Sequence, residues 1–224
     1  MSAYEDYDDL LRDEGLSNLI DDELRRIAEA PVFEYLAQHG DAIEERVRSC
    51  LAEARALADA GFPGAGLVRA TAGIEIVIRF FLTRPLVQGA FLSSEWAALL
   101  SGKVLHSRTA EDRQLLPAIL RNWDLDITAL ILSTGAQLWE TIVTRVQQRR
   151  NSYVHQGGTA TDEDAALAIE SLTRLLDDIV IPIAQRLGFT REQSGSWAVI
   201  IRKNTPEFPD LNPPYRYARR DPFA

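Results

Sequence analysis

The sequence predicts an all-α protein, and three observations lead to that prediction. Apolar residues recur at helical spacing along four long stretches, each of which is followed by glycine or proline. The apolar share of 46% and the charged share of 25% are those of an ordinary globular chain. Four long helices with short or inserted connections favour an up-and-down four-helix bundle. Residues 197–201 differ, because their β-branched composition is typical of a strand.

The first two long helices are expected at 41–60 and 65–83. The first has apolar residues on one face and stops at Gly61, where glycine accommodates the turn that ends a helix. The second is apolar on most of its sides, which is typical of a central, buried helix. Pro85 is expected to end it.

The third long helix is expected at 135–155, with a stop at Gly157 and the next residue, also glycine. Thr161 and the three acidic residues after it form an N-cap cluster, because carboxylates are favourable at a helix N-terminus. The fourth helix starts there, is expected to kink at Pro182, and closes at Gly188.

Shorter helices are expected near 94–100 and 111–122, inserted between the main elements. The resulting organisation has an acidic N-terminal arm over 1–40, a helical bundle over 41–188, and a strand-like, proline-rich extension over 189–224. The tail from residue 205 onward holds five of the ten prolines and is expected to be extended.

The net charge of −9 is unevenly distributed. Residues 1–60 hold 16 acidic and 6 basic residues, whereas residues 61–224 hold 17 and 18. The acidity therefore belongs to the N-terminal quarter and does not argue against a polyanionic partner. No stretch reaches the length of a membrane span, so we expect no membrane partner. Cys50 is the single cysteine, which fits a reducing compartment, and a cytoplasmic location is expected.

Several classes of functional site are excluded because the sequence lacks the residues that they require. No Walker-type phosphate loop, Cys/His zinc pattern or Gly-x-Ser-x-Gly nucleophile elbow is present in the sequence. No metal and no cofactor are therefore expected.

The chemically suggestive cluster is Arg150, Asn151 and His155 near the end of the third helix. Asn151 and His155 are four residues apart and share one face, while Arg150 lies about 100° around the helix from Asn151. An imidazole can transfer a proton near neutral pH, and a guanidinium can hold two phosphate oxygens. Arg145 and Arg149 add positive charge nearby.

This pattern of arginine, polar residue, three residues, histidine and a glycine turn resembles the Arg-x4-His motif of the HEPN superfamily. The order of the predicted helices over 41–188 is similar to that family's four-helix layout. The resemblance implies a metal-independent endoribonuclease that acts as a homodimer with a composite active site. His155 would transfer the proton, Arg150 would stabilise the phosphorane, and Asn151 would orient the phosphate or the imidazole. The 2′-hydroxyl of RNA would be the nucleophile and a 2′,3′-cyclic phosphate the product.

Arg145, Arg149, Tyr153 and Glu75 are candidate substrate-binding residues. Tyr153 is more often a packing residue than a chemical one at such a position. Glu75 stands on an apolar helix, where it either pairs with Arg79 four residues later or faces the active site.

Two functions stay open. The first is a ribonuclease of the toxin–antitoxin or phage-defence type, restrained by an antitoxin or another defence-system partner. The second is a non-catalytic HEPN-like module that binds nucleotides or protein partners. In addition, the nine carboxylates of residues 1–24 could mimic RNA and occupy the basic site, or simply increase solubility.

Overall fold

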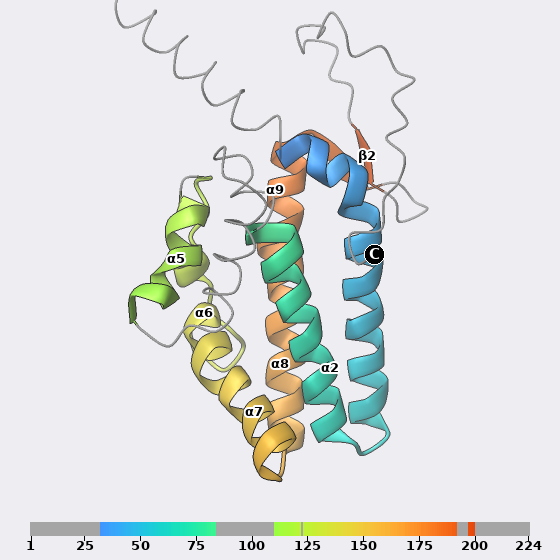
Figure 1. Cartoon of the computed structure of the whole chain (residues 1–224), viewed down its shortest axis with the longest axis vertical. Coiled ribbons are helices and arrows are strands. Elements are labelled where there is room, and N and C mark those ends of the chain that lie inside the picture. The colour runs from blue at the N-terminus through green and yellow to red at the C-terminus, as the bar shows by residue number, and fades with distance from the viewer. Residues whose placement is uncertain (1–31, 84–109, 122, 192–196, 200–224) are drawn as a thin grey trace, which may run out of the picture.

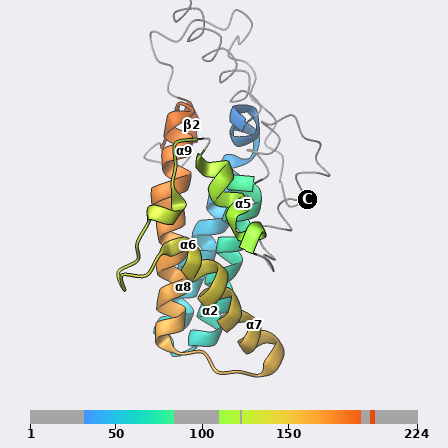
Figure 2. The ribbon, with the colours of Figure 1, turned by 90° about the vertical axis from the view of Figure 1, so that its left-hand side faces the viewer.

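A computed structural model describes residues 32–83, 110–121, 123–191 and 197–199 of the chain. These residues are mostly helical, which confirms the predicted predominance of helix. Figure 1 shows long helical columns packed side by side, and neighbours in the sequence run in opposite directions. In the view turned by 90°, α5, α6 and α7 lie in front and the helix over 32–59 lies behind (Figure 2). No helix in the described ranges is long and apolar enough to span a bilayer.

The first helical column begins by residue 32 and continues to residue 59. Val32, Tyr35 and Leu36 are buried, at the spacing that places them on one helix face. The bundle therefore starts earlier than the expected boundary at residue 41, and 32–40 belong to this packed helix and not to the acidic arm. Phe33 and Glu34 stand between them, so these residues form a short apolar cluster and not an obvious helical repeat. The rest of the arm lies outside the described residues.

The second column consists of α2 (Pro63–Ile76) and the π-helical segment η1 (Val77–Thr83). It passes very close to its neighbours at two glycines on one face, seven residues apart. A Cβ at Gly66 would lie 3.0 Å from the carbonyl oxygen of Ala54. At Gly73 it would lie 2.5 Å from Cδ2 of Leu172 and 3.1 Å from Cβ of Cys50. These glycines let α2 lie against both adjacent helices, so it is the central helix that the sequence predicts.

The third column starts at α6 (Leu138–Glu140) and continues through η3 (Thr141–Val146) into α7 (Gln147–Gln156). It begins at Leu138 and not at residue 135. Gly135 has a φ of 80°, in the left-handed region, and sits in a turn closed by a β-bridge between Ile131 and Gln137. The predicted start of this helix was therefore about one turn too early.

The fourth column contains α8 (Asp162–Leu175), η4 (Leu176–Val180) and α9 (Ile181–Arg186). Pro182 lies in the first turn of α9, directly after the wide π turn, where its missing N–H costs little. Gly188, with a φ of 90°, ends the helix as predicted. The chain then forms strand β1 (Phe189–Arg191), which pairs antiparallel with β2 (Trp197–Val199). The strand-like composition predicted for 197–201 thus corresponds to β2 in its described part.

The inserted region contributes α5 (Ala110–Arg121) and the 3₁₀ turn η2 (Ile127–Ala129), so the short helix predicted at 111–122 is confirmed. Hydrogen bonds hold this region to the bundle: Trp139 Nε1 donates to the carbonyl of Arg113 at 2.7 Å, and Arg186 donates to the carbonyl of Trp123 at 2.6 Å and to Asp124 at 3.1 Å. The helix expected at 94–100 and the proline-rich tail lie outside the described residues.

Replacing Gly73 with valine is expected to destabilise the fold by about 1–3 kcal/mol, because the added carbons overlap Leu172 and Cys50. Chemical denaturation measures the difference. Ala72→Val, a β-branched substitution at the adjacent, half-buried position, is the control and should cost less. Equal losses for the two variants would show that the close approach at Gly73 is unimportant.

Candidate functional site

The predicted motif lies on α7, a helix with no buried residue of its own. It is held against the bundle by Ile142 and Val146 in the preceding π-helical segment, both buried. The helix ends where the sequence predicts. Gly157 adopts the left-handed conformation with a φ of 67°, and its N–H and that of Gly158 both donate to the carbonyl of Ser152.

Arg150 and Asn151 are in direct contact. Nη1 of Arg150 donates a hydrogen bond of 3.0 Å to Oδ1 of Asn151, and both groups face solvent. This bond fixes the carboxamide orientation, so that its NH₂ group points away from the arginine and is available as a donor.

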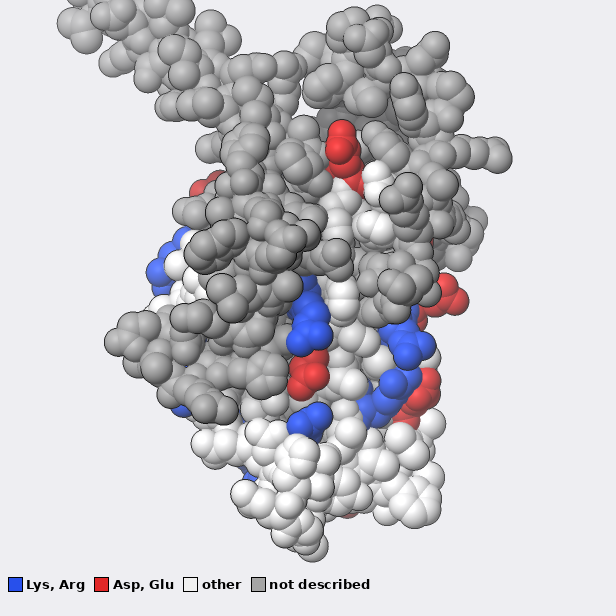
Figure 3. Space-filling model, viewed as in Figure 1, with Lys and Arg blue, Asp and Glu red and all other residues white. Residues whose placement is uncertain are grey.

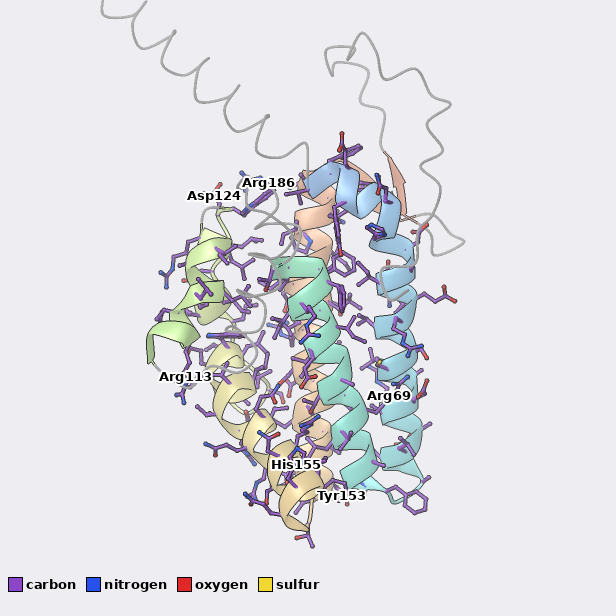
Figure 4. The ribbon with its side chains drawn as sticks, viewed as in Figure 1. Arg69, Arg113, Asp124, Tyr153, His155 and Arg186 are labelled. Atoms are coloured by element: carbon purple, nitrogen blue, oxygen red, sulfur yellow. The ribbon has the colours of Figure 1, made fainter. Side chains whose placement is uncertain are left out.

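His155 is exposed at the lower end of α7, close to Tyr153 in the view of Figure 4. Within the described residues, its imidazole has no hydrogen-bond or ion-pair partner. Residues 150 and 155 both lie in regular α-helix, about 140° apart around the axis. A single copy of α7 therefore does not direct Arg150 and His155 toward one atom.

A hollow of about 600 Å³ lies along α7 and the segment before it. All its described lining residues are polar: Thr144, Arg145, Gln148, Arg149, Asn151, Ser152 and Gln156. Three of the predicted residues, Arg145, Arg149 and Asn151, meet there, whereas Arg150 and His155 are not part of the lining. No sequence motif indicated the four uncharged lining residues, which are Thr144, Gln148, Ser152 and Gln156. The spacing of four of Gln148, Ser152 and Gln156 was the available signal, because it places these three in one row on α7, and Thr144 lies just before them in η3.

Arg149 links α7 to the start of α8. Its Nε lies 3.5 Å from Oδ1 of Asp164, whose side chain is only 4% exposed. The other oxygen of Asp164 accepts from the backbone N–H of Thr161 at 3.1 Å, and Oγ1 of Thr161 accepts from the Asp164 N–H, which completes a capping box. The sequence predicted the cap, but the contact with Arg149 depends on how two helices pack.

Tyr153 packs against α2. A Cβ at Gly64 would overlap ring atoms of Tyr153, so the ring lies directly on the glycine backbone. The ring is 38% exposed, and its inner face fixes the end of α7. This position favours the packing role for Tyr153 over a chemical one.

Glu75 is half-buried on α2, 11 residues beyond Gly64 and so about 16 Å further along the helix. The structure therefore places it far from the contact between α2 and α7. The predicted pair with Arg79 does not form between these two described residues. Because α2 changes to π-helical geometry at Val77, residues four apart no longer stack above one another.

No group of three or more His, Cys, Asp or Glu suited to a metal ion occurs among the described residues. Burial raises the pKa of the Cys50 thiol, which makes this cysteine a poor nucleophile.

Thr161→Ala is expected to lower the free energy of unfolding by about 1 kcal/mol, because an N3 backbone N–H at the start of α8 loses its acceptor. Urea denaturation measures this. Thr159→Ala, at an exposed position two residues earlier and outside the capping box, serves as the control. A Thr161 variant as stable as the control would mean that the cap contributes nothing.

The chain matches no family model, no curated protein and no solved structure. Membership of the HEPN superfamily is therefore an expectation from the motif, and function has to be argued from the residues that α7 presents.

Proposed function

We propose that this protein is a metal-independent endoribonuclease of the HEPN type. The observation that carries the proposal is the exposed end of α7, which presents a guanidinium, a carboxamide and an imidazole to solvent on a helix with no buried residue. The antiparallel helical columns, with the motif at the C-terminal end of the third, are consistent with the family's four-helix layout.

In this proposal His155 either accepts the proton of the RNA 2′-hydroxyl or donates one to the leaving 5′-oxygen, and water carries out the other of these two proton transfers. The 2′-oxygen attacks phosphorus, the bond to the 5′-oxygen breaks, and the products carry a 2′,3′-cyclic phosphate and a 5′-hydroxyl. Arg150 stabilises the charge that builds on the non-bridging oxygens. Oδ1 of Asn151 already accepts a hydrogen bond from Arg150, so Asn151 directs its NH₂ group at the phosphate.

A second copy of the chain completes the site. Arg150 and His155 point about 140° apart on one helix, so each scissile phosphate receives His155 from one protomer and Arg150 from its partner. The end of the bundle that carries Tyr153 and His155 is suited to self-association. It exposes Phe62 (62%) and Val154 (45%), and Figure 3 shows that the lower end of the visible face is nearly free of charged side chains.

The same weakly charged end also favours the second candidate, a non-catalytic module that recruits a protein partner. Exposed Phe62 and Val154 would serve as its contacts. The two candidates differ in whether the motif residues are needed for RNA cleavage.

RNA incubated with the full-length protein and excess EDTA is expected to be cleaved to fragments ending in 2′,3′-cyclic phosphate. His155→Ala should lower the rate about 10²–10⁴-fold, because the proton-transfer group is lost. Arg150→Ala should lower it about 10²–10³-fold. The products are identified by mass spectrometry.

Arg46→Ala is the matched control, since it removes an exposed arginine from the helix on the opposite side of the bundle. Circular dichroism confirms that each variant is folded. Absence of cleavage by the wild-type protein, or cleavage that survives both motif substitutions, would favour the interaction module. If cleavage also makes the protein toxic on expression, His155→Ala should relieve the toxicity, as expected for a toxin or defence effector.

Co-expression of the His155→Ala and Arg150→Ala chains tests the composite site. Each variant alone is inactive, but a mixed dimer contains one site with both groups intact, supplied by different protomers. Activity of the separately tagged and co-purified heterodimer is expected to recover to about half of wild type. The double variant His155→Ala/Arg150→Ala paired with either single variant is the control and should stay inactive. A heterodimer without activity would place both groups of a site on one chain.

A further inference from the structure

The segment between Glu140 and Asp162 has an unusual charge. Residues 141–161 contain Arg145, Arg149 and Arg150 and no aspartate or glutamate, although the chain as a whole has a net charge of −9. The remaining polar residues of this segment are mainly threonine, glutamine, asparagine and serine. A helix that faces solvent would normally mix both signs of charge, so an excess of cations and neutral donors indicates an anionic partner.

The hollow along α7 gathers these groups on one surface. Among its described lining residues are two arginines, three carboxamides and two hydroxyls, with no carboxylate and no aromatic ring. Arg145 has no ion pair with any described residue and is exposed, so its guanidinium is available to a ligand. Arg149 is 56% exposed and lies 3.5 Å from Asp164, a distance at which the pair is weak and can yield to a stronger anion.

The chemistry of this lining suits a sugar–phosphate backbone better than the bases. Guanidinium, carboxamide and hydroxyl groups donate to phosphate oxygens, and these contacts position a nucleic acid without reading its sequence. The Thr144 hydroxyl is already used, because it donates to the carbonyl of Glu140 at 2.6 Å, so the arginines, the carboxamides and Ser152 are the donors in the hollow. Base-stacking platforms need aromatic side chains, and the described lining has none.

We infer that this hollow binds the backbone of single-stranded RNA next to the scissile phosphate; the inference rests on the ribonuclease proposed above. Asn151 connects the two regions, because it lines the hollow and also accepts the hydrogen bond from Arg150. A strand held in the hollow therefore reaches the motif along the same helix. The row from Thr144 to Gln156 covers about 18 Å, which is too short for the two minor grooves and about 16 base pairs that duplex-binding domains contact.

Binding is measured with His155→Ala as the parent protein, so that the RNA stays intact, by fluorescence anisotropy of a labelled single-stranded oligouridylate. Gln148 has no described partner and stands in the middle of the row. Gln148→Glu is expected to weaken binding about ten-fold, because it places a carboxylate among the phosphate contacts. Arg145→Ala should weaken binding and lower the slope of log Kd against log salt by about 0.7, the value for one phosphate contact on a single strand.

The matched control is Gln114→Glu, the same substitution and charge change at an exposed position on α5. It should bind as tightly as the parent. If Gln148→Glu and Gln114→Glu weaken RNA binding equally, the effect comes from the net charge of the protein, and the inference is overturned. Binding of polyglutamate as tight as that of RNA, or an unchanged salt slope in Arg145→Ala, would also overturn it.

These results separate this inference from the ribonuclease proposal. Binding that depends on Gln148 and Arg145 in a protein that never cleaves RNA would refute catalysis and leave the hollow as a binding site. Cleavage that depends on His155 but is unaffected by Gln148→Glu would refute the hollow alone.

Discussion

The placement of α7 depends on two contacts at its sides, because its own residues are not buried. On one side the ring of Tyr153 lies on the backbone of Gly64, and on the other Arg149 approaches the buried carboxylate of Asp164. The first contact joins α7 to the start of α2, and the second joins it to the cap of α8. The buried Ile142 and Val146 of the preceding segment anchor the start of this polar helix, so most of its surface stays free for a ligand. The residues that stabilise the bundle are therefore different from the residues that α7 presents on its surface.

The main helices could be predicted because each combines regular apolar spacing with a clear end. Gly157 and Gly188 both adopt positive φ, which glycine tolerates and other residues rarely do, so they mark helix ends reliably. The described helix already includes residues 32–40, before the expected boundary at residue 41, and Val32 and Tyr35 bury one of its faces. The pair between Glu75 and Arg79 failed because a change to π-helical geometry leaves no visible mark in the residue pattern.

The candidate site also combines features that follow from the sequence with features that depend on helix packing. The sequence alone gives the positions of Arg150 and His155 on the helix surface, because their angular separation follows from helix geometry. It does not give the contact of Arg149 with Asp164 or the place of Tyr153 on Gly64, since both depend on which helices become neighbours. The lining residues spaced four apart can be placed from the sequence, yet the existence of the hollow depends on what the packed helices leave open.

A surface of this kind has a specific advantage for an enzyme that cleaves a long polyanion. The motif groups on one α7 point in different directions, so under the proposed function an isolated chain would have little power to cleave RNA even when RNA is bound. In the proposed scheme, a hollow about 18 Å long with two arginines holds a backbone weakly, through the few phosphates that fit along it. Binding would then depend on the hollow while cleavage depends on a second protomer. Under this scheme the cleavage activity rises with the square of protein concentration at low concentration. Dimer assembly and RNA binding can then be controlled independently, without any change in the motif residues.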